Sequence, residues 1–184
     1  MPEILLYFLL FAITTGATIS LVLVTIGLIT MIATKVPYAP VPKKRVKQMI
    51  DLFNLTPGQK FYDLGCGDGR FVAEAAKRGA DAIGFEISPW VYARAHFKTM
   101  LVPGKAKIVF KNFYTTDLSD ADAIYCFLID KVMQKVENKL IAELKPGAKV
   151  ISYGFKLPNW QPEQVILSNL DKPRSSKIYI YIKK

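Results

Sequence analysis

Three glycines at alternate positions, with acidic residues before and after them, are the residues of this sequence best suited to hold a ligand. Residues 61–70 read FYDLGCGDGR, and Gly65, Gly67 and Gly69 lie between a strand-like run and a helix-like run. Glycine allows positive φ and lets a ligand approach without meeting a Cβ. The following helix would add unpaired N–H groups and the positive end of its dipole. The spacing is G-x-G-x-G, so the pyrophosphate fingerprint of dinucleotide sites is not matched.

Two later strand ends supply further polar groups. Glu86 follows Gly65 by 21 residues, the distance at which an acid reaches a ribose hydroxyl in this topology. Asn112 and Phe113 follow a third strand and offer an amide and a ring to an adenine. With Asp63 as an anchor for an amino-acid group, these strand ends predict a site for S-adenosylmethionine. The predicted cofactor-binding residues are Asp63, Gly65, Cys66, Gly67, Gly69, Glu86, Asn112 and Phe113.

These residues need a sheet with helices to position them. Apolar runs predict strands at 60–64, 82–87, 107–110, 123–128 and 149–153, and helical spacing predicts helices at 43–55, 70–78, 89–100 and 130–144. This alternation favours an α/β fold, a Rossmann-like, mostly parallel sheet with helices on both faces. Two further runs, 164–167 and 177–182, follow short loops and are expected to add an antiparallel hairpin.

The first 34 residues have a different character. Positions 4–33 contain no Asp, Glu, Lys or Arg, and about 20 apolar residues suffice to cross a bilayer. A signal peptide has a basic n-region and a shorter apolar run, and a mitochondrial transit peptide is rich in arginine. Here the first arginine is Arg45. We expect an uncleaved transmembrane helix at 1–34, a basic linker and first helix at 35–58, and a methyltransferase domain at 59–184; the alternative for the first segment is a buried core helix.

The charge distribution predicts an orientation. The net charge is +10, and all 25 basic residues follow position 34, as do all 15 acidic residues except Glu3, so residues 35–184 carry +11. Basic residues cluster just after the apolar segment, at Lys35, Lys43, Lys44, Arg45 and Lys47. The positive-inside rule then predicts a single-pass protein with its catalytic domain on the cytoplasmic side. Anionic lipid explains this cluster as well as nucleic acid would, so a nucleic-acid partner is not expected.

Other features exclude some classes and leave others open. A single histidine, His96, excludes His-dependent triads and most zinc sites, and we expect no metal. Two cysteines exclude a disulfide scaffold. Ala12, Gly16 and Ser20 recur at every fourth position, a small-residue face that can pair membrane helices in a homo-oligomer, although such spacings also occur by chance.

The chain resembles the class I, seven-stranded S-adenosylmethionine-dependent methyltransferases. More narrowly, it is similar to the small membrane-anchored lysine methyltransferases that modify the c protein of ATP synthase and the adenine nucleotide translocase. The resemblance rests on the apolar N-terminal helix, the VPYAPVP linker at 36–42, the 63–70 turn, GFEISPW at 84–90, and residues 139–160. The sequence departs from the family pattern at Val41, at Cys66 and in the segment Asn112-Phe113-Tyr114. It also lacks an Asn-Pro-Pro-Tyr motif after the fourth strand.

The resemblance implies an enzyme that methylates a lysine of a membrane or membrane-proximal protein, on the matrix side of the mitochondrial inner membrane if the source is eukaryotic. A sulfonium methyl is already activated, so the protein has to align a neutral amine and exclude water. Tyr38, in the Pro-rich linker, is the candidate catalytic residue, although it could simply pack against the first helix. The candidate aromatic wall around the substrate ammonium comprises Trp90, Tyr125, Phe155 and Trp160. The alternatives are methylation of RNA, a lipid or a small acceptor, and a non-catalytic protein that binds S-adenosylmethionine.

Overall fold

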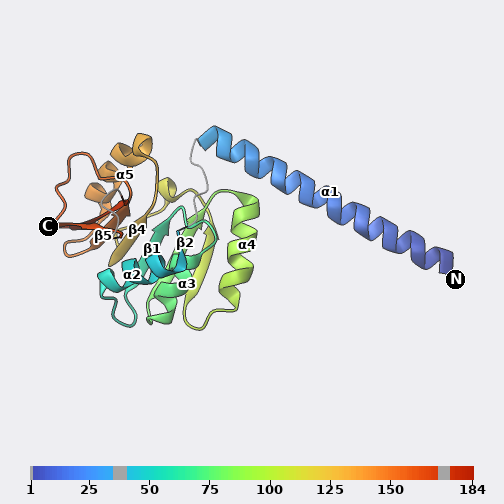
Figure 1. Cartoon of the computed structure of the whole chain (residues 1–184), viewed down its shortest axis with the longest axis horizontal. Helices are drawn as coiled ribbons and strands as arrows, with labels where there is room; N and C mark the ends of the chain where they lie inside the picture. Colours follow the sequence, from blue (N-terminus) through green and yellow to red (C-terminus); the bar gives the residue numbers. More distant parts are fainter. Residues whose placement is uncertain (1, 35–40, 170–174) are drawn as a thin grey trace.

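The computed structural model describes residues 2–34, 41–169 and 175–184. A long helix, α1 (Pro2–Thr34), projects from an α/β domain, as Figure 1 shows. In the described part of the chain, one helix is long and apolar enough to cross a membrane: Glu3–Ile29, with a mean hydropathy of 2.2. None of its most apolar stretch is buried. A core helix would be buried, so the structure favours the membrane-helix interpretation of this segment.

A seven-stranded sheet forms the centre of the domain. Its strands are β1 (Lys60–Leu64), β2 (Asp81–Glu86), β3 (Ala106–Phe110), β4 (Ala123–Cys126), β5 (Lys149–Tyr153), β6 (Gln164–Leu167) and β7 (Lys177–Ile182). They lie in the order β3-β2-β1-β4-β5-β7-β6. The first five pair in parallel, whereas β7 is antiparallel to both β5 and β6. The expected parallel sheet and closing hairpin are therefore confirmed.

Helices cover both faces of the sheet, as the two separate apolar clusters indicate. On one face, α2 (Lys43–Phe53), α3 (Arg70–Lys77) and α4 (Pro89–Met100) pack with residues such as Phe61 and Ile151. On the other, α5 (Asp130–Glu143) packs with residues such as Leu64 and Ile124. Side chains of a strand alternate between faces, so Asp63 and Tyr125 lie on the α3 face. They are direct partners in the β1–β4 pairing.

Element boundaries differ from the sequence predictions mainly at β4. The apolar run predicted a strand over 123–128, but pairing with both neighbours ends at Cys126, opposite Leu64 and Ser152. Beyond that point the chain leaves the sheet, and Phe127 and Leu128 line a cavity instead. A 3₁₀ turn, η1 (Phe113–Thr115), was also not predicted; the side chain of Asn112 caps it by accepting a hydrogen bond from the Tyr114 N–H at 3.0 Å.

The C-terminal part of α1 packs against the start of α4. A Cβ added at Gly27 would lie 3.4 Å from Ser88 Oγ and 3.9 Å from Trp90 Cβ. Glycine at this position therefore lets the two helices approach closely. α1 is thus not an independent appendage, because its last described turns contact the domain beside the first turn of α4.

Candidate functional site

The turn from β1 to α3 has the conformation that its glycines predict. Gly65, Gly67 and Gly69 have φ values of 87°, 55° and 74°, in a region that residues with a Cβ rarely adopt. The carbonyl of Phe85 accepts hydrogen bonds from Gly65 N at 3.1 Å and from Cys66 N at 2.9 Å, which fixes the turn to β2. The turn therefore offers a backbone surface without side chains at the carboxyl edge of the sheet.

Glu86 at the end of β2 organises the next part of the site. Its Oε2 accepts from Gly67 N at 3.1 Å, and its Oε1 accepts from Ile87 N at 2.9 Å and Ser88 N at 2.8 Å. Burial raises the pKa of Glu86 despite these three hydrogen bonds, which act in the opposite direction. A carboxylate has about four lone-pair sites, so an acceptor position remains for a hydroxyl group of a ligand.

Asp63 and Tyr125 are buried next to each other with unused polar atoms. No residue of the described structure forms a hydrogen bond with the Asp63 carboxyl group. Burial, followed by the charges of Glu86 and Asp68, holds the pKa of Asp63 well above its usual range. The hydroxyl of Tyr125 is buried and has no partner in the described structure, while its ring stacks on Phe71 with centroids 3.7 Å apart. Buried polar groups without partners are uncommon, and here both belong to a cavity wall.

A network of charges closes one end of the site. Asp68 accepts from Arg70 Nε at 2.7 Å, Arg70 Nη2 at 2.8 Å and Lys98 Nζ at 2.7 Å. Burial alone would raise the pKa of Asp68, but these hydrogen bonds and charges outweigh it and lower the pKa to about 2. Arg70 also donates to the carbonyl of Val41. The network thereby fastens the chain just after the linker to the start of α3.

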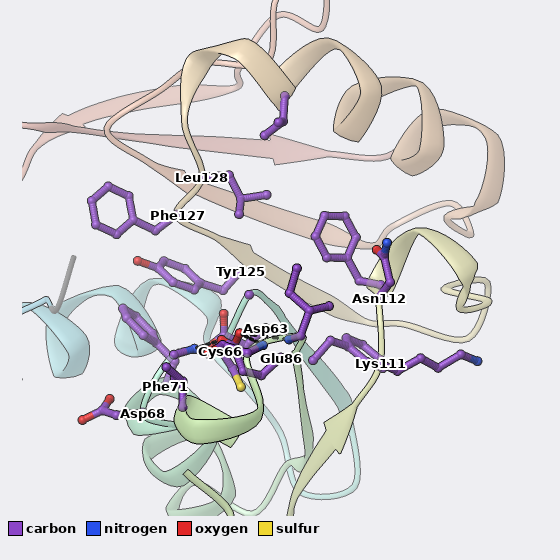
Figure 2. Close-up of a pocket in the computed structure, with 18 of the residues that line it drawn as sticks. Asp63, Cys66, Asp68, Phe71, Glu86, Lys111, Asn112, Tyr125, Phe127 and Leu128 are labelled. Atoms are coloured by element: carbon purple, nitrogen blue, oxygen red, sulfur yellow. Dashed lines mark hydrogen bonds between the residues drawn. The ribbon is translucent and has the colours of Figure 1, made fainter. Parts of the chain in front are cut away.

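These groups surround a cavity of about 780 Å³, within the range typical of small-molecule sites. Figure 2 shows Asp63, Cys66 and Glu86 together at its centre, with Tyr125, Phe127 and Leu128 opposite them. Lys111 and Asn112 lie at one end, and Asp68 and Phe71 lie at the other (Figure 2). The predicted site residues that line this cavity are Asp63, Gly65, Cys66, Gly67, Glu86, Trp90, Asn112, Phe113, Tyr125 and Phe155.

Three predicted residues are not brought to this cavity. Gly69 does not line it; a Cβ there would lie 3.1 Å from Thr99 Cγ2 and 3.2 Å from Ile108 Cδ1, so this glycine allows close packing. Trp160 packs against Tyr181 with ring centroids 5.5 Å apart, and it lines a separate small pocket. Tyr38 lies outside the described residues.

The structure also adds residues that the sequence did not single out. Val24, Gly27 and Leu28 of α1 line the cavity; a glycine within an apolar helix was the only available indication. Phe71 follows the glycine turn and supports Tyr125, a contact that depends on how α3 packs. Lys135 lies 4.3 Å from the Tyr114 ring centroid at the cavity edge.

The cavity fits S-adenosylmethionine on the evidence of its own atoms. Gly65 leaves no room for a side chain, because a Cβ would lie 3.3 Å from Leu128 Cδ2. The Asp63 carboxyl group faces the cavity without a partner in the described structure, as an anchor for an α-ammonium group requires. Glu86 retains an acceptor site for a ribose hydroxyl, and Asn112 and Phe113 lie at the far end, where an adenine would lie.

Comparisons with known proteins agree with this geometry. A model of the ANTKMT methyltransferase domain matches residues 63–164. A protein-lysine N-methyltransferase of Saccharolobus islandicus is 37% identical over 151 residues, covering 80% of this chain and 93% of the relative. The mouse adenine nucleotide translocase lysine N-methyltransferase is 36% identical, with 75% and 61% covered. The human lysine N-methyltransferase named for the c protein of ATP synthase is 30% identical, with 89% and 72% covered.

Solved structures are similar as well. An RNA methyltransferase from Salinibacter ruber in complex with S-adenosyl-L-homocysteine has a TM-score of 0.71 and 29% identity, covering 78% of this chain and 93% of that chain. The magnesium protoporphyrin IX methyltransferase of Synechocystis, with bound S-adenosylhomocysteine, has a TM-score of 0.61 at 13% identity and supports the fold alone.

Proposed function

The chain belongs to the ANTKMT family of S-adenosylmethionine-dependent protein-lysine N-methyltransferases, and we propose that its acceptor is a lysine at the surface of the membrane that holds α1. The observation that carries the proposal is the composition of the cavity wall. Val24, Gly27 and Leu28 of the apolar helix line the same cavity as the predicted cofactor residues. A helix in the bilayer therefore forms part of the site, so the acceptor is expected to arrive beside it.

The cofactor, when bound, supplies a sulfonium methyl group that needs no further activation. The chain itself has to hold a neutral amine in line with that group and keep water out. A lysine amine has a pKa of about 10.4 in water, and burial lowers the pKa of an amine because it disfavours the charged form. Tyr125, Phe127, Phe155 and Trp90 give the cavity an aromatic wall, which both excludes water and can hold an ammonium group before it loses its proton.

We assign the unpartnered hydroxyl of Tyr125 to the incoming amine. This hydroxyl is buried in the cavity wall beside Asp63, its partner in the β1–β4 pairing. Burial and the charge of Asp63 raise the pKa of Tyr125 well above its usual range, so the phenol stays neutral. A neutral phenol can accept a hydrogen bond from the substrate amine and orient its lone pair. Tyr38 remains the proposed contribution of the linker to the same amine site.

Topology follows from the charges on either side of the site. We propose a single-pass protein whose catalytic domain lies on the side of Lys43, Lys44 and Arg45, the cytoplasm or the mitochondrial matrix. The mouse relative is named for the adenine nucleotide translocase and the human relative for the c protein of ATP synthase. We propose the same chemical class of acceptor for this chain, a lysine of an integral membrane protein. A shared bilayer raises the local concentration of such an acceptor.

The acceptor class is tested by following the methyl group. The full chain in lipid nanodiscs is incubated with radiolabelled S-adenosylmethionine and either membrane fractions or total RNA, and acid hydrolysates of the products are separated. Labelled methyl-lysine from the membrane fraction is the expected result. Label in RNA, as the likeness to an RNA methyltransferase would suggest, or in extracted lipid would replace the proposal. Tight cofactor binding without any transfer would indicate a non-catalytic protein.

A further inference from the structure

One side of α4 presents large apolar side chains to solvent. Trp90, Arg94, Phe97 and Leu101 follow one another at intervals of three or four residues, so they form one stripe along the helix. Met100 lies beside this stripe. We call these five residues the α4 face. Phe97 is 70% exposed, Met100 67% and Leu101 88%. A contiguous apolar surface of this kind marks an interaction site in a soluble domain.

From this face we propose that the catalytic domain rests on the surface of an anionic lipid bilayer through α4. The inference deepens the proposed function and rests on the insertion of α1 in the membrane. The position of α1 is the first argument, because Gly27 packs directly against Ser88 and Trp90 at the start of α4. Figure 1 shows α4 at the edge of the domain on the side toward which α1 extends. A bilayer that contains α1 therefore lies close to the α4 face.

The charges around the α4 face are the second argument. Arg94, Lys107 and Lys111 have no ion-pair partner among the residues of the described structure. Lys98 and Lys105 are paired with Asp68 at 2.7 Å and Asp81 at 3.1 Å. Unpaired cations beside apolar side chains are the pattern of helices that lie in the membrane interface. They attract anionic headgroups, whereas an acidic surface patch of a protein would not fill the apolar stripe with lipid chains.

The edge of the sheet extends this surface. β3 is the edge strand next to α4, and Phe110 at its end is 53% exposed. The ring of Tyr92 joins the two elements, with its centroid 5.4 Å from that of Phe110. Trp90 and Lys111 belong both to this surface and to the cavity wall. A bilayer against α4 would therefore lie beside the cavity, within reach of a lysine at the headgroup level.

The experiment measures contact with lipid at single positions of the full chain. Leu101→Cys introduces a labelling site on the α4 face, and both native cysteines are buried. Val165→Cys is the matched control, because Val165 is an exposed apolar residue on β6, at the opposite edge of the sheet. Ile13→Cys reports on α1 itself. Each variant is labelled with an environment-sensitive fluorophore and placed in nanodiscs of phosphatidylcholine and phosphatidylglycerol with brominated acyl chains.

The proposal predicts that brominated lipid lowers the fluorescence at position 101 by at least about twofold, as expected for a group at interfacial depth, and leaves position 165 unchanged. Quenching at position 13 without quenching at position 101 would overturn the α4 inference while leaving the membrane helix in place. Absence of quenching at both positions would contradict the membrane helix as well. A change at position 101 that depends on protein concentration, or on an added acceptor protein, and not on lipid would mean that a protein covers the face and would equally overturn the inference.

Discussion

Replacing Glu86 with glutamine tests the predicted geometry of the cofactor site with little change in shape. The glutamine carbonyl can still accept from Ile87 N and Ser88 N, which both donate to Oε1 in the wild type. Its –NH₂ group takes the place of Oε2, so the hydrogen bond from Gly67 N at 3.1 Å is lost and two donors face each other. The same substitution removes an acceptor that a ribose hydroxyl would use.

The expected size of the effect follows from these lost contacts. A hydrogen bond to a charged group contributes about 1.5–3 kcal/mol, and about 1.4 kcal/mol corresponds to a tenfold change in affinity. For Glu86→Gln we expect the Kd for S-adenosylhomocysteine, measured by isothermal titration calorimetry, to rise about 10- to 100-fold. Glu74→Gln is the matched control, because Glu74 forms ion pairs with Lys77 and Arg78 on α3 and lies outside the cavity.

Two measurements decide the outcome. Circular dichroism verifies that both variants retain the fold, since the lost bond to Gly67 is also expected to lower stability. A folded Glu86→Gln variant whose Kd stays within about twofold of the wild type would refute the role of this carboxylate. An equal loss of affinity in the Glu74→Gln control would attribute the effect to a general change of charge rather than to the site.

Further variants test other parts of the site. The raised pKa of Asp63 means that folding favours its protonated form, so this group makes the protein less stable as the pH rises above the unfolded value of about 3.9; Asp63→Asn is expected to be more stable than the wild type in urea at pH 7, less so near pH 4, and to bind the cofactor more weakly, and a wild type that is more stable at both pH values would contradict this. Gly84→Ala puts a Cβ 2.6 Å from Cys66 Cβ and is expected to lower the free energy of unfolding by about 1–3 kcal/mol in urea titrations; an unchanged midpoint would count against the packing of the glycine turn on β2. Tyr125→Phe removes a buried hydroxyl without a partner in the described structure, so stability should hold or rise while methyl transfer falls about tenfold or more, and Tyr38→Phe should lower transfer at unchanged cofactor affinity; wild-type turnover in either variant would remove that tyrosine from the mechanism.

The cofactor side of the site could be predicted from sequence because local rules determine it. The φ values of the glycine turn depend on glycine itself, and the place of Glu86 depends on a strand of ordinary length after a short helix. Parallel strand ends meet at one edge of a sheet, so Asp63 and Glu86 had to lie near each other once the alternation of strands and helices was recognised.

The acceptor side could not be predicted in the same way, because it depends on packing between distant segments. Trp160 and Phe155 are close in sequence, yet only Phe155 reaches the cavity, because the N–H of Trp160 is held by Glu137 Oε2 at 3.1 Å on α5. The contribution of α1 depends on Gly27, whose missing side chain allows contact with α4. Neither contact leaves a pattern in the local sequence.

The position of the methylated residue is the most direct test of the central claim, lysine methylation at the surface of the bilayer that holds α1. The full chain is reconstituted with membrane fractions and isotopically labelled S-adenosylmethionine, and the labelled peptides are identified by mass spectrometry. We predict methyl-lysine within the first few residues outside a transmembrane segment, on the same side of the membrane as Lys43–Phe53. Label confined to soluble proteins, to lysines on the opposite side, or to RNA would contradict the account.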